Sequence, residues 1–188
     1  METQGNQRTR RSIRLPGFDY SNVGMYFVTV CAVQQRCIFG RIQGTGAILS
    51  PIGEIVEASW IDIPHHFPNV KIETFVVMPN HMHGILTIDS KLPDANCKDN
   101  CTASTELFGK PSAKSIPTII RSFKSAATKR VRESRLPIMG SIWQRGYYER
   151  VLRDTQEYVE ATNYILQNPA RWVRNEENPN RTPGAEDL

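Results

Sequence analysis

Residues 70–89, which read VKIETFVVMPNHMHGILTID, contain two strand-like runs joined by a very short link. Residues 70–78 and 81–89 are rich in β-branched and other apolar residues, and only Pro79 and Asn80 separate them. A link of two residues leaves room only for an antiparallel hairpin or a sharp bend. The stretch therefore predicts two neighbouring strands of an antiparallel sheet.

The second of these strands has two chemically different faces, because side chains alternate along a strand and residues two apart point the same way. One face, which we expect to lie in the core, carries Met82, Leu86 and Ile88. The other face carries His81, His83, Ile85 and Thr87. Two imidazoles on one face suggest a metal site, although a pair of exposed histidines would give the same spacing.

The rest of the chain alternates between strand-like and helix-like segments. Residues 26–34 are typical of a strand. Ser50 and Pro51 are typical of a helix start, and apolar residues then recur at helical spacing as far as Pro64. The later segments are a helix over 115–133 with a basic outer face, a strand over 142–152 that Gly146 interrupts, and a helix over about 155–168 that Asp154 caps.

This order of elements predicts an α+β fold. The pattern β-α-β-β-α-β followed by a helix is typical of a ferredoxin-like (RRM-like) sandwich, an antiparallel sheet with two packed helices, here with an extra C-terminal helix. A chain of 188 residues, 39% of them hydrophobic, suits one domain, which we expect over residues 15–173. We expect a basic arm over 1–14, a polar loop insertion over 90–114 and a disordered tail over 174–188.

The composition also bears on location and partners. No apolar run approaches the ~20 residues of a membrane helix, and the arginine-rich start does not resemble a secretory signal. We therefore expect a cytoplasmic, nucleoid-associated protein with no membrane partner and with reduced cysteines. Cys97 and Cys101 lack the second pair of ligands that a zinc knuckle needs. The net charge of +4 favours a polyanionic partner, but solvated basic surfaces would give the same charge.

The last predicted helix adds two polar side chains. Tyr164 and Asn168 are four residues apart, so they lie on one stripe, together with Glu157, and could approach one cation. An alternative is that Tyr164 packs at the edge of the core and Asn168 caps a helix that Pro169 ends. The apolar face of this helix, beside that stripe, comprises Tyr158, Val159, Ala161, Thr162, Ile165 and Leu166.

Four pieces of the sequence together resemble one known family. They are RRSIRLPGFDYSNVGMYFVTV (10–30), FVVMPNHMHGIL (75–86), IWQRGYYERVL (142–152) and EYVEATNYILQNPARW (157–172). In this order they resemble the single-tyrosine HUH transposases (IS200-like), and most closely the REP-associated tyrosine transposases. The His-Met-His segment alone is a weak signal, but its combination with Trp-Gln-Arg and Tyr-Ile-x-x-Asn-Pro is specific.

The resemblance implies a metal-dependent endonuclease and strand-transferase that cleaves single-stranded DNA near hairpin or palindromic repeats through a 5′-phosphotyrosine intermediate. It implies that Tyr164 is the nucleophile and that His81, His83 and Asn168 hold Mg²⁺ or Mn²⁺. Ligand softness alone would let the two imidazoles favour zinc. The resemblance leaves open whether the protein is a monomer or a homodimer in which each tyrosine helix serves the partner's site.

Several assignments stay open. Glu157 or Glu160 could replace Asn168 as a ligand. Phosphate contacts are expected from Arg10, Arg11, Arg14, Arg121, Lys124, Arg145 and Arg150. Unpaired bases could stack on Phe18, Tyr20 or Tyr147, although roles as packing residues suit these rings better. The alternatives to a transposase are a non-catalytic single-stranded nucleic-acid-binding module on the same fold and a zinc hydrolase of small molecules.

Overall fold

The computed structural model describes residues 22–89, 115–137 and 140–172 of the chain. In chain order, the elements are β1 (Gly24–Cys31), the 3-10 turn η1 (Val33–Gln35), β2 (Gly40–Gln43), β3 (Gly46–Leu49), α1 (Pro51–Ile61), α2 (Ile63–His66), β4 (Val70–Val77), β5 (His81–Ile88), α3 (Ile116–Glu133), β6 (Tyr148–Leu152) and α4 (Thr155–Arg171). The predicted arm, polar loop and tail lie outside the described residues, as do Arg10, Arg11, Arg14, Phe18 and Tyr20. Within the described ranges, none of the helices combines the length and the hydrophobicity that crossing a membrane requires.

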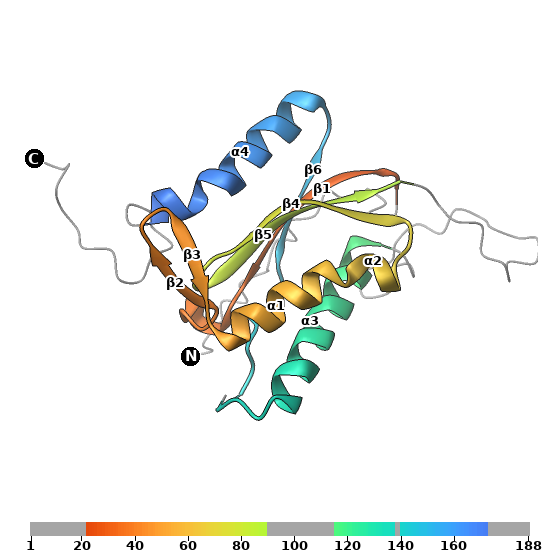
Figure 1. Ribbon diagram of the computed structural model, residues 1–188. Coiled ribbons are helices and arrows are strands. Elements are labelled where there is room, and N and C mark those ends of the chain that lie inside the picture. The colour runs from red at the N-terminus through yellow and green to blue at the C-terminus, as the bar shows by residue number, and fades with distance from the viewer. Residues whose placement is uncertain (1–21, 90–114, 138–139, 173–188) are drawn as a thin grey trace, which may run out of the picture.

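Four strands form one antiparallel sheet in the order β4-β5-β1-β6. The short turn at Pro79 and Asn80 joins β4 to β5, which confirms the predicted hairpin. Figure 1 shows α1, α2 and α3 on one face of this sheet and α4 on the other face. The predicted α+β class, an antiparallel sheet with packed helices, is thereby confirmed.

Two segments differ from the sequence prediction. A separate two-stranded hairpin, β2 and β3, was not predicted, because its strands have only four residues each and carry little periodicity. The predicted strand over 142–152 is wrong for residues 142–147, since only Tyr148–Leu152 pairs with β1 as a strand. The predicted interruption at Gly146 is confirmed, because its φ of 81° is a left-handed conformation that does not fit a continuous strand.

The last helix also runs further than predicted. α4 continues through Pro169 to Arg171 instead of ending near residue 168. A proline so close to the end of a helix removes one of its last hydrogen bonds and leaves the rest in place. The backbone N–H of Trp172 donates to the carbonyl oxygen of Pro169 and closes the helix.

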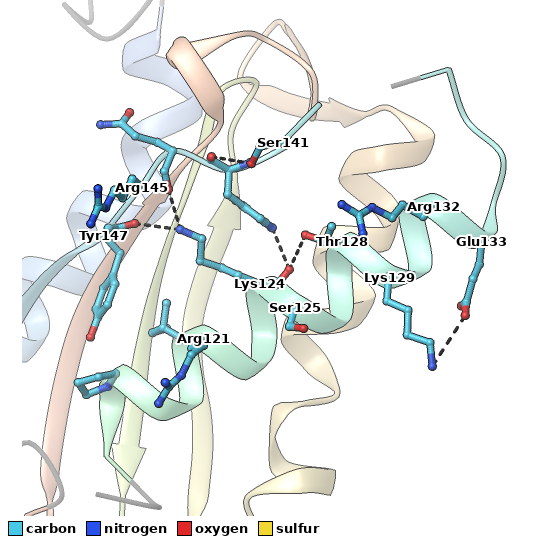
Figure 2. Close-up of a pocket in the computed structure, with 15 residues that line it drawn as sticks. Arg121, Lys124, Ser125, Thr128, Lys129, Arg132, Glu133, Ser141, Arg145 and Tyr147 are labelled. Carbon is cyan, nitrogen blue, oxygen red and sulfur yellow. Dashed lines mark hydrogen bonds and ion pairs between the residues drawn. The ribbon is translucent and has the colours of Figure 1, made fainter. Parts of the chain in front are cut away.

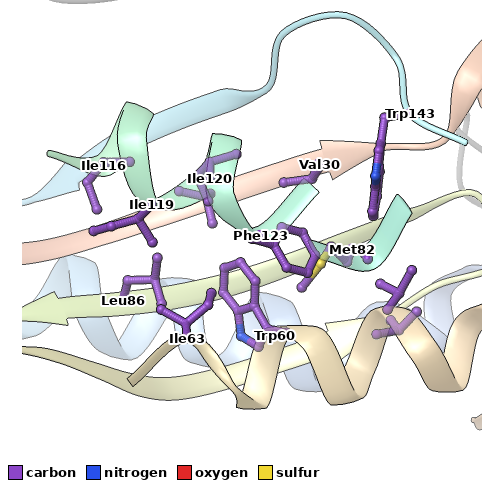
Figure 3. Packing of buried hydrophobic residues seen from close by; sticks show 14 of the residues in the cluster. Val30, Trp60, Ile63, Met82, Leu86, Ile116, Ile119, Ile120, Phe123 and Trp143 are labelled. Carbon is purple, nitrogen blue, oxygen red and sulfur yellow. The ribbon is translucent and has the colours of Figure 1, made fainter. Parts of the chain in front are cut away.

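The larger core lies between the sheet and the helices α1 and α3, as Figure 3 shows. Met82 of β5 is buried there, as predicted, beside Trp60 of α1 and Phe123 of α3. The rings of Trp60 and Phe123 meet edge-on, with 5.1 Å between their centroids. Gly84 is required by this packing, because a Cβ at that position would lie 2.4 Å from Cζ2 of Trp60. The glycine of the His-Met-His-Gly segment therefore has a packing role.

A smaller apolar cluster lies between the other face of the sheet and α4. Ile85, Leu152 and Ile165 are buried in it. Two residues of the apolar face of α4 lie outside this cluster, because the side chains of Val159 and Leu166 are 48% and 65% exposed. The sheet contacts a narrower part of the helix than the run of apolar residues suggested.

Candidate active site

β5 presents its two histidines to the face of the sheet that α4 covers. His81 and His83 are buried, and each is only 2% exposed. Their ring centroids lie 4.5 Å apart. The two imidazoles are therefore neighbours on one face, as their spacing of two residues predicted.

Asn80 sets the orientation of the first histidine. Nδ1 of His81 lies 2.6 Å from Oδ1 of Asn80, which is itself buried. An amide oxygen only accepts hydrogen bonds, so Nδ1 carries the proton and donates it. In the neutral ring the lone pair is then on Nε2. Backbone N–H groups of Ala32 and Phe39 donate to the carbonyls of Asn80 and Pro79 and hold this turn in place.

Thr29 is the corresponding neighbour of the second histidine. It lies opposite His83 in the pairing of β1 with β5, and its Oγ1 is 2.8 Å from Nδ1 of His83. A hydroxyl both donates and accepts, so this contact fits a His83 ring with its lone pair on Nε2. That Nε2 is buried and has no hydrogen-bond partner among the residues that the structure describes.

Burial keeps both imidazoles neutral. Loss of hydration lowers the pKa of His81 from 6.5 to about 4. The same effect, with a smaller contribution from the nearby His81, lowers the pKa of His83 to about 3. Neutral imidazole is the form that binds a metal ion, so the pair is in the ligand form at neutral pH.

α4 brings Tyr164, Asn168 and Trp172 to the histidines. The ring of Tyr164 lies 5.1 Å from that of His83, and the ring of Trp172 lies 6.0 Å from that of His81, centroid to centroid. Asn168 is one helical turn from each of these aromatic residues, so it lies on the side of α4 that faces the pair. It is 2% exposed, and its Oδ1 has no hydrogen-bond partner within the described part of the chain.

These groups fit a divalent cation. Two neutral imidazoles and a buried amide oxygen are all metal ligands, and the buried Nε2 of His83 and Oδ1 of Asn168 have no other role in the described structure. No group of three or more His, Cys, Asp or Glu side chains in residues 22–89, 115–137 and 140–172 converges on a metal position. The buried amide oxygen of Asn168 is a group that could serve as a third ligand beside the two imidazoles.

The two glutamates that were considered as ligands have other contacts. Oε1 of Glu157 lies 3.1 Å from Nη2 of Arg150, and the same carboxylate accepts a hydrogen bond from the backbone N–H of Arg153. The hydrogen bond from the backbone of Arg153 is the largest cause of a lowered pKa of Glu157, and the hydrogen bond from the side chain of Arg150 is the next. Glu160 accepts from the side chain of Gln156 and lines the cleft described next.

A cleft of about 570 Å³ opens beside the tyrosine, between β1, β6 and α4. Tyr164 and Tyr148 are 39% and 42% exposed, and both contribute to its lining. Phe27 lies between them, edge-on to each ring, with centroid distances of 6.1 and 6.4 Å. Arg150, which is paired with Glu157, also lines this cleft. A phenol that solvent can reach thus lies among aromatic rings and next to buried neutral imidazoles.

The predicted phosphate contacts are divided between two faces of the sheet. Arg150 lies in the cleft, whereas Arg121, Lys124 and Arg145 line a second groove along α3, which Figure 2 shows. Nζ of Lys124 donates to the backbone carbonyls of residues 144 and 146 at 2.7 and 3.0 Å. Lys124 therefore holds the loop before β6.

Tyr147, a candidate for base stacking, lines this second groove and donates its hydroxyl hydrogen to Glu149 at 2.6 Å.

Sequence reasoning missed several residues of the site. Phe27 and Thr29 reach His83 only through the register between β1 and β5, which a single sequence does not reveal. Trp172 depends in the same way on how α4 docks. Asn80 was visible as an amide directly before His81, but its role depends on the burial of the turn.

The chain has relatives in both sequence and structure. No protein-family model matches it. A Haemophilus influenzae protein of unassigned function is 36% identical over 172 residues, which make up 89% of this chain and 92% of that protein. Another protein of this bacterium, named as a candidate REP-associated tyrosine transposase, is 24% identical over 153 residues, 81% of this chain and 74% of that protein.

A solved structure has a similar fold. The structure of a REP-associated tyrosine transposase bound to a REP hairpin is 22% identical, with a TM-score of 0.54, and the match covers 84% of this chain and 72% of that chain. This likeness shows a shared fold. The chain therefore belongs to one family with the first Haemophilus influenzae protein, and it is a relative of the REP-associated tyrosine transposases.

Proposed function

We propose that this protein is a single-tyrosine HUH transposase, built on a ferredoxin-like sandwich, that cleaves and rejoins single-stranded DNA beside a hairpin. The observation that carries this proposal is the position of Tyr164. α4 holds its ring 5.1 Å from that of His83 in the same chain and still leaves the side chain 39% exposed. The strand order β4-β5-β1-β6 supports the ferredoxin-like description. The hairpin bound in the related structure supports the choice of substrate.

His81, His83 and Asn168 would hold Mg²⁺ or Mn²⁺. The imidazoles alone would suit zinc, but so few protein ligands leave positions for water and phosphate oxygens, which suits a hard cation that is held loosely. When bound, the cation would stabilise the negative charge that develops on the scissile phosphate. Asn80 and Thr29 would support this role by orienting the two imidazoles.

Tyr164 supplies the nucleophile in this proposal. Its Oη forms a bond to phosphorus while the bond from phosphorus to the 3′ oxygen breaks, which gives a 5′-phosphotyrosine and a free 3′-hydroxyl. A phenol has a reference pKa near ~10, so its proton must pass to water or to a base in the cleft, where Glu160 is one candidate. A second 3′-hydroxyl can then attack the phosphotyrosine: its oxygen bonds to phosphorus while the bond from phosphorus to Oη breaks, Tyr164 takes up a proton, and new strands are joined without ATP.

The cleft beside Tyr164 suits unpaired nucleotides. Phe27 and Tyr148 offer ring surfaces on which bases can stack, and Arg150, which is paired with Glu157 but half-exposed, can donate hydrogen bonds to the backbone. Bases in a duplex are already stacked on each other and would gain little from these rings. Because Tyr164 lies beside His83 of its own chain, we propose that a monomer completes its own site.

The test is a search for a covalent adduct. The protein is incubated with single-stranded DNA from the region that flanks its gene, with Mg²⁺ or Mn²⁺, and the products are separated on a denaturing gel. We expect a metal-dependent adduct with wild type and with the control Tyr158→Phe, which alters a half-buried tyrosine of the same helix. We expect Tyr164→Phe to bind DNA without forming the adduct. Binding without any adduct in wild type would instead identify a non-catalytic binding module.

A further inference from the structure

The hydroxyl of Tyr164 must lose its proton as it attacks phosphorus. A phenol has a reference pKa near ~10, so it carries its proton at neutral pH and is then a weak nucleophile. A base placed beside the hydroxyl accepts the proton in the transition state, and such bases speed reactions by roughly 10²- to 10⁴-fold. The residues that line the cleft beside Tyr164 are the place to look for this base.

Among the described residues, the only carboxylate in the lining of this cleft belongs to Glu160. The lining also contains Cys31, His83, Tyr148 and Arg150. Arg150 is a cation, and His83 is assigned to the metal ion. Thiols and phenols such as those of Cys31 and Tyr148 carry their own protons at neutral pH. Within the described cleft, Glu160 is therefore the ionised group that can accept a proton.

The helix places this carboxylate beside the phenol. Glu160 and Tyr164 are four residues apart on α4, so they lie one turn apart on the same side of the helix. Long side chains of a helix lean toward its N-terminus, which directs the ring of Tyr164 over the turn that carries Glu160. Both side chains line the same cleft, so they face the space that the DNA strand would enter.

Gln156 holds the carboxylate without neutralising its charge. Nε2 of Gln156 donates to Oε1 of Glu160 at 3.0 Å. The second carboxylate oxygen, Oε2, has no hydrogen bond within the described part of the chain. The side chain of Glu160 is exposed, so a proton that it accepts can pass on to solvent.

Glu157, the other carboxylate on this side of α4, is less suited to the role. It is bound to the guanidinium of Arg150 and to the backbone N–H of Arg153. The backbone hydrogen bond, followed by the bond from Arg150, lowers the pKa of Glu157 and makes it a weaker base. Its side chain also lies outside the described lining of the cleft.

We propose that Glu160 is the general base for cleavage and the general acid for rejoining. This inference rests on the proposed function. In cleavage, a carboxylate oxygen of Glu160 takes the proton from Oη of Tyr164 while Oη bonds to phosphorus, and the 3′ oxygen leaves phosphorus and takes a proton from water. In rejoining, the carboxyl group returns a proton to Oη while the bond from phosphorus to Oη breaks, and the proton of the attacking 3′-hydroxyl passes to water.

The test measures the rate of adduct formation in a single turnover with Mn²⁺, with the protein in excess over the DNA. The variants are Glu160→Gln, Glu160→Asp and Glu160→Ala. Glu54→Gln is the matched control, because it removes the same charge from an exposed site on α1, on the other face of the sheet (Figure 1). Fluorescence anisotropy measures the affinity of each protein for the DNA, and circular dichroism checks the fold.

Chemical rescue separates a base from a structural residue. Sodium formate, a small carboxylate that can occupy the space left in Glu160→Ala, is added to each protein, and sodium chloride at the same ionic strength is the comparison. Wild type with formate controls for any effect of formate on the metal ion.

We expect Glu160→Gln and Glu160→Ala to form the adduct at least roughly 100-fold more slowly, with DNA affinity no weaker than that of the control. Glu160→Asp should keep part of the rate, and formate should accelerate Glu160→Ala but not wild type. A wild-type rate in Glu160→Gln, or a loss in Glu160→Ala that formate does not relieve, would overturn the inference and leave the proposed function standing. An absence of adduct in wild type would overturn the proposed function and this inference with it.

Discussion

Nδ1 of His81 donates a hydrogen bond to Oδ1 of Asn80 across 2.6 Å, and both residues are buried. The bond lies within the turn that joins β4 to β5. The Pro-Asn pair therefore does more than connect two strands, because its amide decides which nitrogen of the next residue carries the proton. The hairpin and the orientation of the first histidine come from the same short piece of sequence.

Loss of this amide should weaken metal binding. We expect Asn80→Ala to reduce the affinity for Mn²⁺ by about 10- to 100-fold, because His81 would no longer be held in the form with its lone pair on Nε2. Asn80→Asp keeps an acceptor at the same place and should retain binding. A titration followed by electron paramagnetic resonance measures both affinities, and circular dichroism checks the fold. Wild-type affinity in Asn80→Ala would show that the amide does not orient the ring.

The buried imidazoles should make the protein sensitive to acid. Burial lowers the pKa of His81 to about 4 and that of His83 to about 3, whereas an unfolded histidine titrates near 6.5. Below pH 6.5 the unfolded chain binds more protons than the folded chain, so the stability is complete above that pH and is lost as the pH falls toward these lowered values.

Urea unfolding at a series of pH values measures this loss. We expect the free energy of unfolding to fall between about pH 6.5 and pH 4, and to fall less steeply in His83→Gln. The comparison requires metal-free protein, since a bound ion would stabilise the neutral rings. An identical slope in the variant would rule out His83 as the titrating group.

Gly84 should tolerate no larger side chain. A Cβ there would lie 2.4 Å from the ring of Trp60, which is fully buried and has no room to move away. We expect Gly84→Ala to cost about 1–3 kcal/mol in the free energy of unfolding. Gly46→Ala is the control, because the nearest atom to a Cβ there is 4.0 Å away, and we expect a change of no more than about 0.5 kcal/mol. Similar values for both variants would contradict this packing.

Two adjacent residues of α4 test how that helix docks on the sheet. Ile165 is fully buried, and Leu166 is 65% exposed. We expect Ile165→Ala to cost about 2–5 kcal/mol and Leu166→Ala no more than about 0.5 kcal/mol in thermal or chemical unfolding. The reverse order would mean that α4 lies on the sheet in another rotation, and Tyr164 would then not face His83.

Much of this structure could be predicted from local patterns. The period of two in β5 placed both histidines on the face opposite Met82, and the period of 3.6 placed Tyr164 and Asn168 on one stripe. These rules give the direction of a side chain but not the width of the surface that covers it. For that reason the pattern did not reveal that Val159 and Leu166 of the apolar face are exposed.

The remaining features depend on contacts between distant segments. The register of β1 with β5 brings Thr29 to His83, and no single strand encodes that register. The loop before β6 was mistaken for a strand because its apolar and aromatic residues resemble one. Its path depends on Gly146 in a left-handed conformation and on the hydrogen bonds from Lys124 of α3.

The most direct test of the central claim is to locate the covalent bond between protein and DNA. The adduct formed with Mg²⁺ or Mn²⁺ is digested with nuclease and trypsin, and the peptide spanning residues 154–171 is fragmented in a mass spectrometer, which separates Tyr164 from Tyr158. We predict a nucleotide attached through its 5′ phosphate to Tyr164. Attachment to any other residue, or an unmodified peptide after full incubation with hairpin-bearing DNA, would contradict the account.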